Sequence, residues 1–233
     1  MRVPSISHLL LTCAFAACTD SVDPLLDRAD ASELVGGASN GSVDDDRCTG
    51  VVVGGTYENI KVPDGASCTL RGVVVTGNVI ALKDARLTVE DSRVDGNIQG
   101  ENAAVVHVRG GRLGGSLQVH EGVSAGELGV SITGGTVLTQ GNIQVTKMRT
   151  GRILITDAIL EKGNLQVEEN TVTGSLDVAR NRVAQNLEVR KHGGGAAKIV
   201  RDNTVSQKLE CKENDSPFVG GPNSAAEAEE QCF

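Results

Sequence analysis

The sequence predicts an all-β protein folded as a single-stranded parallel β-helix, a solenoid of about eight coils with 19–26 residues each. Three observations support this fold class. A short phrase recurs at nearly constant steps, and its apolar residues alternate with polar ones. The hydrophobic residues are almost all aliphatic, with 3 Phe, 1 Tyr and no Trp, and glycine reaches 29. Thin aliphatic layers stacked between glycine-containing turns are typical of solenoids, and we expect the more common right-handed winding.

The repeated phrase is an apolar residue, two spacers, Asn or Ser, and then an apolar–polar–apolar triplet. Residues 163–189, GNLQVEENTVTGSLDVARNRVAQNLEV, contain that triplet three times. The steps from one coil to the next are 19, 19, 19, 26, 22, 22 and 22 residues, which places equivalent residues of successive coils in rows. The phrase occurs at Asn59, Asn78, Asn97, Ser116, Asn142, Asn164, Asn186 and Lys208.

Each coil is expected to contain at least two short strands, because side chains two residues apart share one face of a strand. Leu165 and Leu187 are one coil apart and should stack in one row, with Leu176 of a second strand across the core. A leucine-rich horseshoe would need more Leu in each repeat than this chain has. A third apolar corner is expected at Val75, Val94, Leu113, Val172, Val183 and Val205.

The N-terminal segment has the pattern of a bacterial secretory signal, with Arg2 followed by an apolar run too short to span a bilayer. Phe15-Ala16-Ala17-Cys18 resembles the lipobox of bacterial lipoproteins, which implies that Cys18 becomes the lipidated first residue and anchors the protein to a membrane. The alternative is a secreted soluble protein with a spare thiol. The expected organisation is a signal peptide at 1–17, an acidic flexible tether at 18–47, the β-helix at 48–214 and a C-terminal cap or tail at 215–233.

The cysteines fit the predicted register. Cleavage before an unlipidated Cys18 would leave five cysteines in an oxidising compartment, whereas lipidation leaves an even set of four. Cys68 falls on an inward core position and Cys48 lies one coil earlier, while Cys211 takes a core position in the last coil within reach of Cys232. Two disulfides are therefore expected, each closing a loop of about twenty residues and contributing about 3 kcal/mol.

The composition argues against several classes of function. A net charge of -8 and a pI near 5.0 exclude nucleic acid as an expected partner, because phosphate binding needs clustered Lys and Arg. His107, His120 and His192 share no metal-ligand spacing, and the acidic run at Asp44–Asp46 lacks the pattern of a calcium loop. No metal or cofactor is expected.

Two polar rows remain as candidates for a binding face. The Asn row is expected to be structural, because stacked amides bond to one another and to turn backbone. A row formed by Gln99, Gln118, Gln144 and Gln166 could instead bind a polysaccharide, a protein partner or another copy of the chain. Glu188 and Glu210 also stack one coil apart, which keeps open a β-helix enzyme that cleaves polysaccharides.

The chain resembles a family of uncharacterised bacterial secreted β-helix proteins over roughly residues 48–233. The motifs that carry the resemblance are Cys48-Thr49-Gly50, Cys68-Thr69-Leu70, the repeated GN-I/L-QV phrase, and Cys211-Lys212-Glu213-Asn214 followed by Gln231-Cys232. It implies the fold and export only. A looser architectural likeness is to bactofilins, which are bacterial β-helix polymers.

The sequence therefore favours a non-catalytic envelope lipoprotein, a β-helix scaffold for surface binding or structural support. The alternatives are a carbohydrate-active β-helix enzyme, a lyase or a hydrolase, and a self-assembling rod similar to bactofilins. The 26-residue step departs from the regular period, and we expect it to form a protruding loop between His120 and Leu128.

Overall fold

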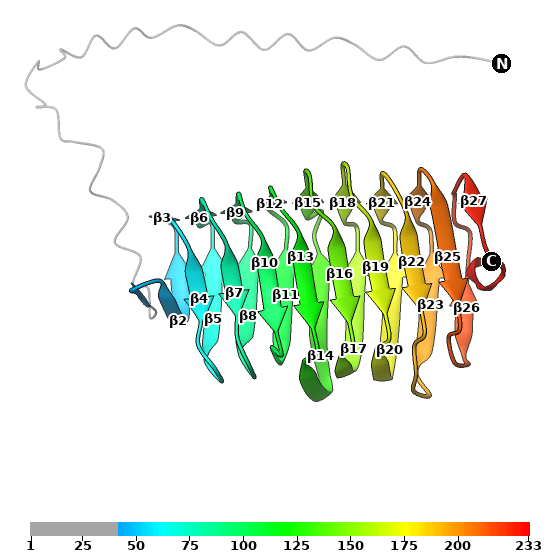
Figure 1. Cartoon of the computed structure of the whole chain (residues 1–233), viewed down its shortest axis with the longest axis horizontal. Helices are drawn as coiled ribbons and strands as arrows, with labels where there is room; N and C mark the ends of the chain where they lie inside the picture. The colour runs from blue at the N-terminus through cyan, green and yellow to red at the C-terminus, as the bar shows by residue number, and fades with distance from the viewer. Residues whose placement is uncertain (1–41) are drawn as a thin grey trace, which may run out of the picture. The chain divides into compact units, whose positions relative to one another are not determined.

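The computed structural model describes residues 42–233 (Figure 1). The predicted signal peptide at 1–17, the predicted lipidation site Cys18 and residues 19–41 of the predicted tether lie outside the described residues. Within 42–233 the strands of successive coils pair in parallel, as predicted for a β-helix. Among the strands of these residues, one pairing is antiparallel, and it joins β1 (Ser42–Asp44) to β2.

Each coil contributes strands to three faces. Face A contains β4 (Ile60–Val62), β7 (Val79–Ala81), β10 (Ile98–Glu101), β13 (Leu117–His120), β16 (Ile143–Thr146), β19 (Leu165–Glu168), β22 (Leu187–Arg190), β25 (Lys208–Lys212) and β27 (Glu227–Ala228). Face B contains β2 (Arg47–Val53), β5 (Ser67–Arg71), β8 (Arg86–Glu90), β11 (Val105–Arg109), β14 (Val123–Thr133), β17 (Arg149–Thr156), β20 (Thr171–Ala179), β23 (Ala197–Arg201) and β26 (Phe218–Gly220). Face C contains β3 (Thr56–Tyr57), β6 (Val74–Val75), β9 (Arg93–Val94), β12 (Arg112–Leu113), β15 (Val137–Leu138), β18 (Ile159–Leu160), β21 (Arg182–Val183) and β24 (Thr204–Val205).

The register follows the sequence repeat. Leu165 pairs with Leu187 on face A, as predicted, and Leu176 lies on face B. One assignment at the third corner was wrong: Val172 lies in β20 on face B, opposite Thr150, and face C is continued by Leu138 and Leu160. Val172 has the apolar spacing of a corner residue, but it belongs to residues that lengthen the turn from face A to face B.

The core is a column of aliphatic side chains that the three faces enclose. Almost every inward Val, Ile and Leu has at most 1% of its surface exposed, including Leu165, Leu176 and Leu187. Each coil adds only a few such side chains, so a coil gains most of its apolar burial from its two neighbours. Stability therefore depends on the unbroken stacking of rows along the axis.

The turns after faces A and B share one device. A residue in the left-handed region follows the strand and is not glycine in most coils, for example Glu169 (φ 55°) and Arg180 (φ 56°). A buried Asn follows at Asn170 and Asn181, and its side chain replaces missing backbone partners. Oδ1 of Asn181 accepts a hydrogen bond from the backbone N–H of Ala158, and its Nδ2 donates to the carbonyl of Ile155. These bonds offset the roughly 1–2 kcal/mol that the left-handed conformation costs an L-residue.

Both ends of the solenoid differ from the predicted boundaries. The tether was expected to run through residue 47, but β1 and β2 form a hairpin whose turn contains Asp45 and Asp46. The C-terminal cap predicted at 215–233 is built as a continuation of the solenoid, because β26 pairs with β23 and β27 pairs with β25. A final 3-10 turn, η1 (Glu230–Cys232), follows β27. Both segments pair with edge strands that the sequence repeat leaves open.

A disulfide lies at each end, between Cys48 and Cys68 and between Cys211 and Cys232, with Cα–Cα distances of 5.7 Å and 5.3 Å. Cys211 occupies the row of Val189, as expected. At the other end, Gly50 rather than a cysteine stands opposite Cys68, so Cys48 bonds from two residues earlier in β2.

Candidate functional site

The predicted glutamine row lies on the outer side of face A. Gln99, Gln118, Gln144 and Gln166 are register partners in four successive coils and are half-buried. Nε2 of Gln118 donates to Oε1 of Gln144 at 2.8 Å, and Nε2 of Gln144 donates to Oε1 of Gln166 at 2.8 Å. The bond from Gln99 to Gln118 is longer, at 3.5 Å. We call these four residues the amide row.

The amide row retains hydrogen-bonding capacity after its own bonds are made. A glutamine side chain has two N–H donors and two carbonyl lone pairs. Gln144 uses one N–H for Gln166 and one lone pair for Gln118. Each inner member of the row can therefore still offer one donor and one acceptor to a ligand on the outer side of face A.

The asparagine row has a structural role. Oδ1 of Asn142 accepts from the backbone N–H of Asn164, and Oδ1 of Asn164 accepts from the backbone N–H of Asn186. The Nδ2 groups of Asn164 and Asn186 also donate to the amide oxygen one coil earlier. These side chains bond to backbone at the turn before each face A strand, so we do not include them in the candidate site.

Charged residues continue the amide row towards the C-terminus. Gln166 pairs with Glu188, which pairs with Glu210. Arg190 lies between the acids: Nη2 is 2.5 Å from Glu168 and 2.7 Å from Glu188, and Nη1 is 3.3 Å from Glu210. Its Nε is buried without a hydrogen-bond partner among the described residues. Face A thus changes along its axis from neutral amides to an ion-pair network.

The two stacked acids have opposite pKa shifts. Burial is the main cause that raises the pKa of Glu188, and neighbouring Glu168 and Glu210 add to it, while Arg190 opposes it. Hydrogen bonds from Lys208 and then Lys212 lower the pKa of Glu210 to about 2. Separated carboxyl pKa values are a feature of acid–base pairs in enzymes, although structural ion-pair networks also produce them.

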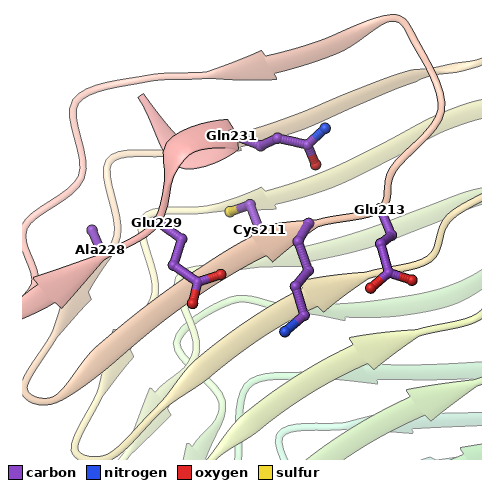
Figure 2. Close-up of a pocket in the computed structure, with 6 residues that line it drawn as sticks. Cys211, Glu213, Ala228, Glu229 and Gln231 are labelled. Carbon is purple, nitrogen blue, oxygen red and sulfur yellow. The ribbon is translucent and has the colours of Figure 1, made fainter.

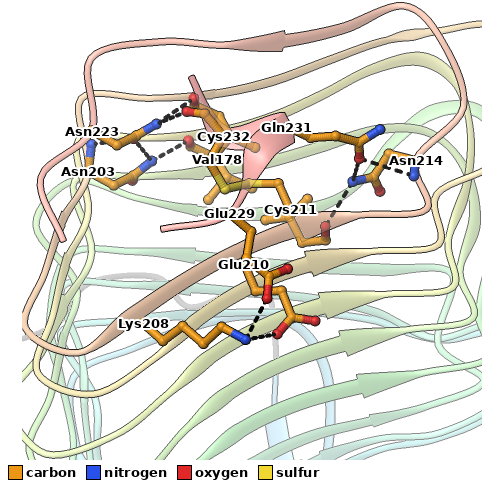
Figure 3. The surroundings of a disulfide bond; sticks show 12 residues. Val178, Asn203, Lys208, Glu210, Cys211, Asn214, Asn223, Glu229, Gln231 and Cys232 are labelled. Atoms are coloured by element: carbon orange, nitrogen blue, oxygen red, sulfur yellow. Dashed lines mark hydrogen bonds and ion pairs between the residues drawn. A yellow bond between two sulfur atoms is a disulfide. The ribbon is translucent and has the colours of Figure 1, made fainter. Parts of the chain in front are cut away.

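The same network attaches the last coil to the solenoid (Figure 3). Nζ of Lys208 is 2.8 Å from Glu210 and 2.6 Å from Glu229, and Lys212 also bonds to Glu210. Next to it is a pocket of about 550 Å³, lined by Cys211, Lys212, Glu213, Ala228, Glu229 and Gln231 (Figure 2). Glu188 and Glu210 are not among the residues that line it, and its one cationic side chain, Lys212, already pairs with Glu210. We therefore interpret this region as a cap.

Two buried titratable side chains have no role in the amide row. His192 is 1% exposed and lies in the column of buried asparagines, and burial lowers its pKa to about 4. Lys198, which the sequence analysis missed, occupies the core row of Leu176 and Phe218. Its Nζ donates to the carbonyls of Gly194 and Ala196, and burial lowers its pKa. Both bond to backbone, which indicates structural roles.

The long coil produces a step at the corner between faces A and B. The span from Glu101 to Val106 is five residues, whereas the equivalent span from His120 to Val130 is ten. The predicted protruding loop between His120 and Leu128 is instead largely strand, because β14 begins at Val123 and continues with register shifts. In Figure 1 this corner lies along the lower edge of the view, where β14, β17 and β20 are labelled.

The lengthened corners of successive coils stack closely into a ridge. A Cβ on Gly151 would lie 2.4 Å from the carbonyl carbon of Gly126, so the chain needs glycine where backbone packs on backbone. Glu127 reaches back over β11 to Arg86 with an ion pair of 2.8 Å. A pocket of about 360 Å³ opens where the short coil meets the ridge, and we call it the step pocket; it is lined by Asn102, Glu121, Val123, Lys147 and Arg149.

Residues 42–233 contain no cluster of three or more His, Cys, Asp or Glu side chains able to hold a metal ion. They also contain no helix long and apolar enough to cross a membrane. Of the histidines weighed as ligands, His120 bonds to Thr146 and His107 to the carbonyl of Leu128.

No family model, curated protein or solved structure matches this chain. The expected resemblance to a secreted β-helix family stays a prediction. The candidate site is therefore defined by its own geometry: the amide row in the middle of face A, the ion-pair network at its C-terminal end, and the step pocket beside it.

Proposed function

We propose that this protein is a non-catalytic scaffold of the bacterial envelope that is exported, anchored through lipidated Cys18, and binds surface polysaccharide along the amide row. The observation that carries the proposal is the row itself. Its members repeat once per coil, about 4.8 Å apart along the axis, and each inner one retains an unused donor and acceptor. A straight row of equivalent amides is complementary to an extended, hydroxyl-rich polymer.

The two disulfides support export, because such bonds persist in oxidising compartments. The anchor at Cys18 is inferred from the lipobox-like sequence and the even number of remaining cysteines. An acidic segment after Cys18 would separate the solenoid from the membrane and leave face A available to polymer.

Binding to a panel of neutral and acidic bacterial surface polysaccharides tests the proposal, with affinity electrophoresis of the full mature chain. The double variant Gln118→Ala/Gln144→Ala should weaken binding at least tenfold, because it removes two contacts of about 1 kcal/mol each. Gln140→Ala is the matched control, since Gln140 is exposed and lies outside the row. Absence of binding by the unchanged protein, or equal weakening by the control, would refute the proposed role of the row.

A second candidate function, cleavage of an acidic polysaccharide, is favoured by the separated pKa values of Glu188 and Glu210. Against it, Glu210 is only 8% exposed and pairs with two lysines and Arg190. Depolymerisation of an acidic glycan that disappears in Glu188→Gln or Glu210→Gln would establish this alternative.

A further inference from the structure

The step pocket combines groups that differ in kind from the amide row. Lys147 and Glu121 follow β16 and β13 in left-handed turn positions, and their charged ends are 3.6 Å apart. Arg149 pairs in register with Val123, and it forms no ion pair with another described residue. The pocket therefore contains two cations and one anion, and the guanidinium of Arg149 has no carboxylate partner among the described residues.

The other two lining residues add complementary chemistry. Val123 is 54% exposed, which is unusual for a valine in a chain whose other face A and face B valines mostly point inward. Asn102 comes from the last short coil and also lines the pocket. The pocket thus presents an apolar patch, an amide and a guanidinium within about 360 Å³, a volume at the lower end for small-ligand sites.

We propose that the step pocket binds the carboxylate of an acidic sugar unit, and that the polysaccharide on face A is therefore a polyuronate. Arg149 pairs with the carboxylate, Asn102 bonds to hydroxyl groups, and Val123 packs against an apolar side of the sugar ring. A guanidinium suits a carboxylate because it can donate two parallel hydrogen bonds. This inference rests on the proposed function and names the class of its ligand.

The position of the pocket supports one continuous ligand path. Glu121 and Lys147 each lie three residues after a member of the amide row, Gln118 and Gln144, in the same two coils. Three residues of strand span about 10 Å. A polymer that contacts the middle of the amide row is therefore close enough to place a neighbouring unit in the step pocket.

The net charge of -8 opposes an anionic ligand only at long range, because screening limits such repulsion to about 8 Å at physiological ionic strength. Within the pocket the balance is positive, with Lys147 and Arg149 against Glu121. Local charge therefore decides which sugar unit is accepted.

The test compares alginate oligosaccharides with their methyl esters, by calorimetric titration of the full mature chain at physiological salt. The acid form should bind at least tenfold more tightly than the ester, and Arg149→Gln should abolish this difference. The matched control is Arg182→Gln on face C, because Arg182 is also exposed and without an ion pair to another described residue. It should leave the difference unchanged.

Three outcomes would overturn this inference, and each bears differently on the proposed function. Equal binding of acid and ester that Gln118→Ala/Gln144→Ala weakens would overturn the step pocket and retain the amide row. If Arg149→Gln and Arg182→Gln reduce the preference for the acid form equally, the preference comes from diffuse surface charge. That result would also overturn the proposed role of the step pocket. Binding of neither form would remove the polyuronate inference, and the polysaccharide panel would then decide the proposed function.

Discussion

Nδ1 of His192 accepts a hydrogen bond of 3.2 Å from the backbone N–H of Asn170. Nε2 of the same ring bonds at 2.9 Å to the carbonyl of Val167, so the buried imidazole is neutral and protonated on Nε2. A proton on Nδ1 would place two donors, that N–H and the backbone N–H of Asn170, opposite each other and break the hydrogen bond. His192 thus performs the task of a buried asparagine, but only in its uncharged form.

This arrangement predicts a pH-dependent stability. The pKa of His192 is about 4 in the folded protein, below its ordinary value of 6.5, so the unfolded chain binds the proton more readily. The contribution of His192 to the free energy of unfolding is fully present above about pH 6.5, and it decreases by about 3 kcal/mol as the pH falls to 4. The stabilising contribution of Glu210 is lost at lower pH, as the pH falls from 4.5 towards 2, because the pKa of Glu210 is about 2 in the folded protein.

Urea unfolding at pH 7.5, 6.0 and 4.5 measures this contribution. His192→Asn should flatten the decline between 6.5 and 4.5, since Asn can continue the column without titrating. His120→Asn is the control, because His120 lies on the outer side of face A. An unchanged decline in His192→Asn would show that another group titrates.

Leu165→Asp should abolish folding or lower the melting temperature drastically. The side chain is fully buried in a thin aliphatic layer, and a carboxylate there would have no partner. Circular dichroism during heating measures the effect, with Gln140→Asp on the surface as the control. A near-normal melting temperature for Leu165→Asp would refute the register of face A.

The double variant Cys211→Ser/Cys232→Ser should lower the free energy of unfolding by about 3 kcal/mol, as expected for a loop of this length. Chemical unfolding of the variant and the unchanged protein gives this difference. In the variant, β27 and η1 should detach from the fold, so their backbone amides should exchange hydrogen faster than those of β16. Uniform exchange rates would contradict a local cap.

The protein should remain monomeric at high concentration. The hairpin of β1 and β2 pairs with part of the edge at one end, and η1 with Cys232 lies at the other, so neither end of the described solenoid has a complete open coil edge. Small-angle scattering over a concentration series tests this, with electron microscopy for filaments. Concentration-dependent filaments would instead support the self-assembling rod.

The rows of the solenoid could be predicted because each residue of a row has the same neighbours in every coil, as Leu165 and Leu187 show. Departures from the repeat could not be predicted from the sequence. Val172 was misplaced because its coil has extra residues at the corner, and the hairpin at Ser42–Asp44 and the pairing of β26 have no repeated pattern to reveal them.

Only part of the candidate site could be predicted from the sequence in the same way. The amide row follows directly from register, and so does the stacking of Glu188 on Glu210. The ion pair between Lys208 and Glu229 joins residues 21 positions apart, and the tail that carries Glu229 does not contain the repeat. The step pocket depends on how far an insertion extends from the corner, which spacing alone does not specify.

The solenoid has a disulfide at each end, and we propose that the chain is exported and anchored by a lipid. Intact mass of the protein recovered from native membranes, before and after reduction, tests it most directly. We predict a chain that begins at Cys18 with a lipid increment and gains the mass of four hydrogens on reduction. An unlipidated chain that begins elsewhere, or a mass that reduction does not change, would contradict the claim.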